Sequence, residues 1–169
     1  MDNNNFQRLG SISNAHVGRD FEAIAKAYFQ LQGIDLKADF SVPVGAGSDT
    51  KYRKFDLGSD NPPVLVECKS HRWTSGGNIP SAKITVWNEA MYYFYLAPQS
   101  FRKVLFVLRD YSRKRGESLA EYYARNYGHL IPDSVEIQEF DESTETVRSV
   151  LTTASTRTGF SAGAPKPAG

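Results

Sequence analysis

Two carboxylates and a lysine stand at a spacing that could hold a metal ion and act on a phosphate ester. Ten residues separate Asp56 from Glu67, and only Cys68 separates Glu67 from Lys69. The apolar run before Glu67 is typical of a buried strand, where charges are costly unless they are paired or bind a metal. The stretch 64–73, VLVECKSHRW, is therefore either an exposed edge with an ordinary ion pair or a working site.

Strand alternation separates these residues into two groups. Side chains along a strand point to opposite faces, so Glu67 and Lys69 share one face while Val66 and Cys68 share the other. We expect the Val66 and Cys68 side to pack into the core. A short connection joins Asp56 to the strand of Glu67, and pairing of the two strands would bring their carboxylates close together.

Converging carboxylates need a counter-charge, and Mg²⁺ is the hard cation that such oxygen ligands prefer. The backbone carbonyl of Cys68 could supply a further oxygen. Lys69 would hold or deprotonate a water, or stabilise the phosphorane, and its pKa decides between these roles. Mn²⁺ is the expected substitute for Mg²⁺.

The elements that must position these residues alternate between helix and strand. Apolar residues at helical spacing, from Val17 to Leu31, predict a first helix capped by Ser13 or Asn14 and ended by Gly33. Strands are predicted at 34–44, 51–59, 64–71, 103–111 and 134–140, and helices at 82–97, capped by Ser81, and at 118–128. Residues 112–117 are predicted as a loop, and 142–151 as either a hairpin strand or a last helix. The order α-β-β-β-α-β-α-β predicts an α/β fold with a mixed central sheet flanked by helices.

The pattern Asp56-x10-Glu67-x-Lys69, after a helix that carries Glu22, resembles the PD-(D/E)XK nuclease superfamily, whose fold is restriction-endonuclease-like. The resemblance implies that Asp56 and Glu67 bind the metal, that Lys69 is the catalytic lysine, and that Glu22 completes the site. The opening helix GRDFEAIAKAYFQLQG is also similar to that of the family. Phe55 stands where the motif name has Pro.

Residues outside the motif are weaker candidates for contact with nucleic acid. Asn88 and Tyr92 are similar to a Gln-x-x-x-Tyr element of one branch of the family, with Asn in place of Gln. Arg72, His71 and Lys83 follow the motif and could contact the phosphate backbone. The alternatives are an incidental loop histidine, solvated basic residues, and a Tyr that packs against the sheet.

Composition bounds the remaining possibilities. The chain has 169 residues, a net charge of +1 and one cysteine, which excludes an internal disulfide and fits a cytoplasmic protein. No apolar run is long enough for a membrane span. We expect a flexible N-terminus over 1–12, a nuclease-like domain over 13–151, and a disordered tail over 152–169, which is rich in Gly, Ala, Pro, Ser and Thr.

The sequence therefore predicts a Mg²⁺-dependent endonuclease that hydrolyses phosphodiester bonds in DNA, in a restriction, repair or phage and mobile-element context. A homodimer would allow both strands to be cut. Two alternatives stay open: an inactive binding or scaffolding module with the same fold, and an RNA-directed nuclease. The residues do not separate DNA from RNA, or endonucleolytic from exonucleolytic cleavage.

Overall fold

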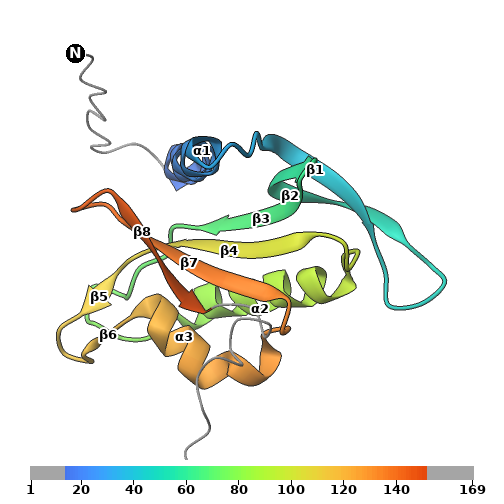
Figure 1. Cartoon of the computed structure of the whole chain (residues 1–169). Helices are drawn as coiled ribbons and strands as arrows, with labels where there is room; N and C mark the ends of the chain where they lie inside the picture. Colours follow the sequence, from blue (N-terminus) through green and yellow to red (C-terminus); the bar gives the residue numbers. More distant parts are fainter. Residues whose placement is uncertain (1–13, 152–169) are drawn as a thin grey trace, which may run out of the picture.

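The computed structural model describes residues 14–151 and is a mixed α/β fold (Figure 1). Its three α-helices are α1 (Asn14–Leu31), α2 (Ser81–Leu96) and α3 (Leu119–Tyr127), with a short 3-10 turn at Gly128–Leu130. The strands of the main sheet are β1 (Lys37–Val44), β2 (Lys51–Asp60), β3 (Pro63–Lys69), β4 (Arg102–Leu108), β7 (Val135–Asp141) and β8 (Thr146–Leu151). A small hairpin is formed by β5 (Tyr111–Ser112) and β6 (Glu117–Ser118).

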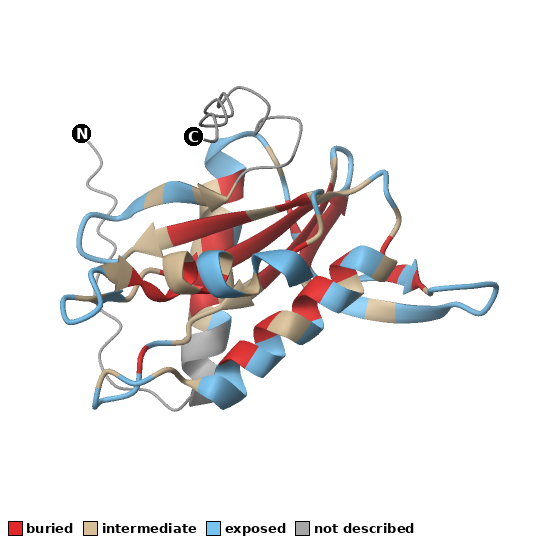
Figure 2. Ribbon diagram, turned by 90° about the horizontal axis from the view of Figure 1, so that it is seen from below, coloured by how far each residue is buried: buried red, intermediate tan, exposed pale blue. Residues whose placement is uncertain are grey.

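The six-stranded sheet has the order β1-β2-β3-β4-β7-β8 and is mixed, as predicted. The strands β3, β4 and β7 run parallel to one another, while β1, β2 and β8 pair antiparallel with their neighbours. Parallel strands covered on both faces are continuously apolar. The β4 strand fits this rule, because it lies inside the sheet and every residue from Lys103 to Leu108 is buried (Figure 2).

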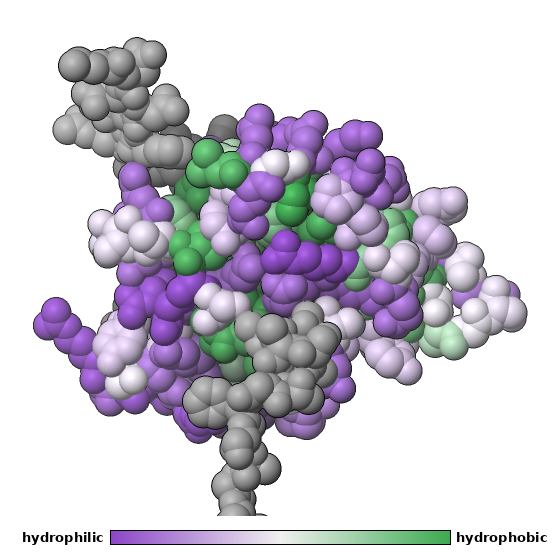
Figure 3. Space-filling view, viewed as in Figure 1, coloured by the Kyte–Doolittle hydropathy of each residue, from purple (hydrophilic) through white to green (hydrophobic). Residues whose placement is uncertain are grey.

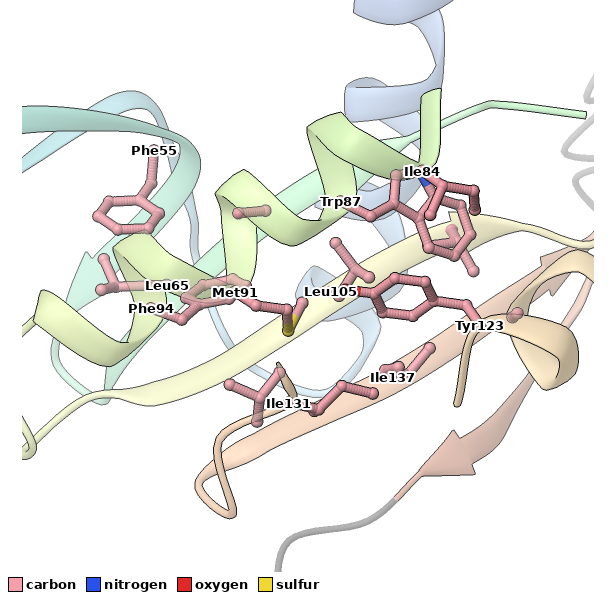
Figure 4. Packing of buried hydrophobic residues seen from close by; sticks show 14 of the residues in the cluster. Phe55, Leu65, Ile84, Trp87, Met91, Phe94, Leu105, Tyr123, Ile131 and Ile137 are labelled. Atoms are coloured by element: carbon pink, nitrogen blue, oxygen red, sulfur yellow. The ribbon is translucent and has the colours of Figure 1, made fainter. Parts of the chain in front are cut away.

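Helices cover both faces of the sheet, with α1 on one face and α2 and α3 on the other (Figure 1). On the α1 face, Phe21, Ala25 and Phe29 pack against Val66 and Phe106 of the sheet. On the opposite face, aromatic and aliphatic side chains of α2 and α3 meet β3, β4 and β7 (Figure 4). The labelled members of that cluster are Phe55, Leu65, Ile84, Trp87, Met91, Phe94, Leu105, Tyr123, Ile131 and Ile137.

The first helix ends as predicted at a glycine in the left-handed region. Gly33 has φ 77°, and the Ile34 N–H donates to the Phe29 carbonyl at 3.0 Å. This hydrogen bond and the one from Gly33 to Gln30 form a Schellman motif. The apolar stripe, however, does not extend to Leu31, which is 90% exposed, because the chain turns there and Phe29 fills the core instead.

Two local predictions are wrong, and the structure decides a third that had two alternatives. Ser81 is the first residue of α2 and not its cap, since Pro80 occupies the N-cap position without a side-chain cap. The predicted loop 112–117 instead contributes to the β5–β6 hairpin. Residues 142–151 resolve in favour of the hairpin strand, since β8 pairs with β7.

The predicted flexible segment 1–12, the cap Ser13 and the predicted disordered tail 152–169 lie outside the described residues. The face seen in Figure 3 is mostly hydrophilic, with apolar side chains showing between polar ones. None of the helices within residues 14–151 combines the length and the apolar character needed to cross a membrane.

Candidate active site

The regular alternation of side chains along strand β2 is broken at Asp56. Residues two apart on a regular strand share a face, yet Phe55 packs in the α2 cluster and Leu57 in the α1 cluster. The ladder between β2 and β3 also stops at the pair Leu57 and Val66. The Asp56 side chain then takes the place of a backbone acceptor, because its Oδ2 accepts from the Cys68 N–H at 2.7 Å.

The three motif residues lie together. The Lys69 Nζ donates to Glu67 Oε2 at 2.6 Å and to Asp56 Oδ2 at 3.4 Å. The Glu67 side chain is only 4% exposed and that of Lys69 13%. The interpretation of an ion pair on an exposed edge is therefore wrong, because β3 lies between β2 and β4 and its charged face is covered.

Burial and mutual charge shift the pKa values of the pair. Burial raises the pKa of Glu67, and the Asp56 carboxylate adds to this while Lys69 opposes it. Burial by itself would lower the pKa of Lys69, but the Glu67 and Asp56 carboxylates outweigh it and leave that pKa raised. Lys69 is therefore an ammonium at neutral pH, which can donate hydrogen bonds but cannot accept a proton.

Arg53 belongs to the same cluster and was missed from the sequence. Its Nη2 lies 3.7 Å from Glu67 Oε1, and its guanidinium carbon lies 3.6 Å from the centre of the Tyr93 ring. Strand alternation could have found it, since Arg53 shares a face with Phe55 and pairs with the buried Val42 across the hairpin. A cation at such an inward position needs a partner, and Glu67 and Tyr93 provide one each.

Glu22 on α1 is half-buried and lies near the cluster without a hydrogen bond to it in the described contacts. Burial raises its pKa, and the carboxylates of Asp56 and Asp39 raise it further, whereas Lys69 lowers it. These charges place Glu22 within electrostatic reach of the motif. Its role as the helix acid stays a prediction.

The Cys68 side chain faces away from the charged pair, as predicted. It packs beside the α1 cluster, and burial raises the pKa of its thiol well above the ordinary value, with Asp56 adding to the shift. A thiol of this kind is a small apolar side chain and not a nucleophile. Its backbone carbonyl stays a predicted ligand.

The second-helix pair Asn88 and Tyr92 does not touch the motif residues in the described contacts. Asn88 Oδ1 accepts from the Tyr123 hydroxyl of α3 at 3.0 Å, and Tyr92 is 57% exposed. The α2 residue that contacts the cluster is Tyr93, through Arg53. On α2 the neighbour of the cluster is therefore Tyr93, and not the predicted Tyr92.

The other predicted contacts with nucleic acid lie after β3. His71 Nδ1 accepts from Trp87 Nε1 at 2.8 Å, and burial, together with Lys83 and Lys69, lowers its pKa to about 4. His71 is thus neutral at pH 7 and could contact phosphate only as a neutral donor. Lys83 is exposed. Arg72 forms an ion pair with Glu142, with 2.6 Å between Nη2 and Oε2.

The fit of a divalent cation can be judged from the donor atoms. Within residues 14–151, no group of three or more His, Cys, Asp or Glu side chains forms a ready metal site. The Asp56 and Glu67 carboxylates nevertheless share a single cation, the Lys69 ammonium. Hard oxygen donors that converge on one positive centre are the ligands that Mg²⁺ and Mn²⁺ use, so the donor chemistry fits.

Comparisons with known proteins give no match, either among protein-family models, curated proteins or solved structures. The functional interpretation therefore depends on the residues and the geometry of this chain.

Proposed function

We propose that this protein is a metal-dependent nuclease that hydrolyses phosphodiester bonds in DNA, on a restriction-endonuclease-like core. The observation that carries the proposal is the convergence of the buried Glu67 and the partly buried Asp56 on Lys69. A fold gains little from such a cluster, because buried ion pairs are often no more stabilising than apolar side chains of the same size. Charges arranged at this cost are typical of functional sites.

The position of the cluster supports the same conclusion. It lies where β3 leaves its ladder with β2 while it still pairs with β4, so the charged groups of β2 and β3 meet at one place. The sequence of elements, with α1 before the three-stranded antiparallel unit and α2 before β4, is the one expected for the restriction-endonuclease-like core. Both features favour a nuclease over an unrelated α/β domain.

Each residue has a chemical role in this proposal. Asp56, Glu67, the Cys68 carbonyl and Glu22 would hold the cation, which supplies Lewis-acid stabilisation of negative charge on the phosphoryl oxygens. Lys69, which is protonated, orients the attacking water and stabilises the charge that develops on the phosphate. The water oxygen bonds to phosphorus, its proton passes to solvent, and the bond to the leaving oxygen breaks as that oxygen takes up a proton.

A cleavage assay tests this proposal. Supercoiled, linear and single-stranded DNA, and RNA, are incubated with the protein in Mg²⁺, in Mn²⁺ and in EDTA. We expect cleavage of DNA only with a divalent ion, and a loss of at least about 100-fold in Lys69→Ala and Asp56→Asn, in the range for removing one stabilising group from a transition state.

Asp60→Asn is the matched control, because Asp60 lies on the same strand as Asp56 but is exposed. It should retain full activity. Cleavage that persists in EDTA, or that survives both site substitutions, would refute the mechanism. Nucleic-acid binding without cleavage of any substrate would favour the scaffolding alternative, and preferential cleavage of RNA would move the substrate to that class.

A further inference from the structure

A groove lies between the outer half of the β1–β2 hairpin and α2. It is lined by Asp49, Lys51, Tyr52, Arg53, Lys54 and Tyr93, among others. The hairpin projects past the end of α2 in Figure 1, and the Gly45 N–H donates to the Leu96 carbonyl at 3.3 Å. The hairpin therefore forms most of the groove, and α2 borders it through Tyr93.

The groove is basic. Lys51, Arg53 and Lys54 line it together with one carboxylate, Asp49. Within residues 14–151, neither Lys51 nor Lys54 forms an ion pair, and both are exposed. The chain as a whole is almost neutral, so this local excess of positive charge marks the groove as a site for an anionic ligand.

Arg53 connects the groove to the candidate active site. It lines the groove, stacks on Tyr93, and points its Nη2 at Glu67. Within residues 14–151 its Nε is buried and has no hydrogen-bond partner, so Glu67 and Tyr93 leave part of its bonding capacity unused. The Arg53 side chain is 30% exposed, and this exposed part of the guanidinium can bind a phosphate oxygen.

Aromatic rings lie beside these cations. Tyr52 lines the groove and is 79% exposed, which packing does not explain. Tyr92 extends the aromatic surface over α2, since its ring centre lies 6.3 Å from that of Tyr93. Exposed rings that alternate with basic side chains are the arrangement on which unpaired bases stack while their phosphates contact the cations.

We propose that this groove binds an unpaired nucleic-acid strand and leads it toward Glu67. Lys51 and Lys54 bind phosphates, Tyr52 stacks on a base, and Arg53 receives the phosphate nearest the carboxylates. Strand binding stands on the groove alone, whereas the direction toward the site rests on the proposed nuclease function. The substrate class is accordingly an unpaired strand or an unpaired end, and not continuous duplex.

Binding in EDTA separates this proposal from cleavage. The probes are a fluorescein-labelled oligothymidylate and a hairpin duplex of equal length, measured by anisotropy over a range of salt concentrations. We expect the wild type to bind the unpaired probe more tightly. Each lysine removed in Lys51→Ala/Lys54→Ala should make the slope of log affinity against log salt shallower by about 0.7. Tyr52→Ala should weaken binding of the unpaired probe by at least about fivefold.

One control variant removes the same number of positive charges outside the groove, and the other removes an exposed aromatic ring. Lys26→Ala/Lys37→Ala removes two exposed lysines outside the groove lining, and Tyr95→Ala removes a ring that is 63% exposed. Both should bind as the wild type does. The proposal that the groove binds an unpaired strand would be overturned by an equal loss of affinity in the controls, by tighter binding of the duplex, or by no binding of either probe. Binding through the groove without cleavage in Mg²⁺ would refute only the proposed nuclease function. Cleavage of the unpaired probe by the groove variants at the wild-type rate would refute only the proposed role of the groove.

Discussion

Two buried glutamates in this molecule are held in different ways. Glu139 on β7 is fully buried and Glu67 on β3 is nearly so. Glu139 accepts from the Ser118 hydroxyl at 2.7 Å, from Arg109 Nε at 3.2 Å and from Arg148 Nε. Glu67 has one hydrogen bond, from Lys69, and its Arg53 contact of 3.7 Å is too long to be a second.

The partners of Glu139 are themselves fixed in place. Arg109 also binds Asp141, and Arg148 also binds Glu121, whose side chain completes the capping box at the start of α3. This network joins β7, β8 and α3, and it satisfies both carboxylate oxygens of Glu139. It is what a structural buried charge requires.

The Glu67 cluster is less complete. Lysine is a flexible point charge, whereas the guanidinium is a rigid fork that binds carboxylates at two points. A carboxylate that accepts its hydrogen bond from a lysine can exchange that partner for a metal ion while the longer Arg53 contact stays in place. Two carboxylates of similar burial therefore differ in the number and stiffness of their partners, and this difference is what separates a structural network from the candidate site.

The comparison predicts its largest effect at Glu139. Glu139→Gln leaves Arg109 and Arg148 facing a neutral amide, and breaking a buried pair costs about 3–5 kcal/mol. We expect a loss at the lower end of this range, about 3 kcal/mol, because Gln retains an acceptor. Denaturant unfolding followed by circular dichroism measures it.

The same substitution at Glu67 should change the free energy of unfolding by less than about 1 kcal/mol, because relief of desolvation offsets the lost attraction to Lys69. Glu117→Gln serves as the control for a pair at the surface, since the side chain of Glu117 is 17% exposed and that of its partner Arg125 62%, and surface pairs contribute about 0–1 kcal/mol. Equal losses at Glu67 and Glu139 would remove the distinction between the two networks.

The second prediction concerns metal. If Glu67 exchanges Lys69 for a cation, saturating Mg²⁺ or Mn²⁺ should stabilise the wild type by about 2.7 kcal/mol when the free ion is about 100 times its Kd. Thermal unfolding with and without the ion measures this.

Glu139→Gln should show the same metal-induced gain from a lower starting point, whereas Glu67→Gln and Asp56→Asn should show none. A gain of equal size in Glu67→Gln would place the ion elsewhere. Comparison with Ca²⁺ and with matched ionic strength separates specific binding from screening.

The comparison also shows what a sequence can and cannot reveal. The elements and the motif were predictable, because the apolar runs around Leu65 and Leu105 and the Gly33 stop are local signals. The proximity of Asp56 to Glu67 was expected from strand pairing, although the ladder between β2 and β3 ends one residue short of Asp56. The twist of β2 at Asp56 was not, since it arises from packing of Phe55 and Leu57 on opposite faces.

The residues that were missed from the sequence reach the two charged clusters only through tertiary contacts. Arg53 lies in a strand whose charged residues look solvated. Its alternation with Phe55 indicated an inward position, but its contact with Glu67 comes from the neighbouring part of the sheet. Tyr92 and Tyr93 are consecutive on α2, and the orientation of the helix about its axis decides which of the two rings faces Arg53. The Glu139 network depends on Arg148 in β8, a segment for which the sequence left helix and strand open.

The smallest predicted effect is the acid sensitivity of the two regions. Hydrogen bonds from Ser143, together with Arg109, lower the pKa of Asp141 to about 2 from an ordinary 3.8. A carboxyl with a lowered pKa stabilises the fold above the unfolded-state pKa, and this contribution is lost as the pH falls from about 4 toward about 2. Burial raises the pKa of Glu67, so its protonation on acidification favours the folded state instead. As the pH is lowered, the free energy of unfolding should therefore fall less steeply in Asp141→Asn than in the wild type. Urea unfolding at a series of pH values measures this. Glu67→Gln should keep the wild-type fall over that interval, and Asp60→Asn, an exposed carboxyl on β2, should as well. An unchanged slope in Asp141→Asn would show that the Arg109 end of the network is not the acid-sensitive part of the fold.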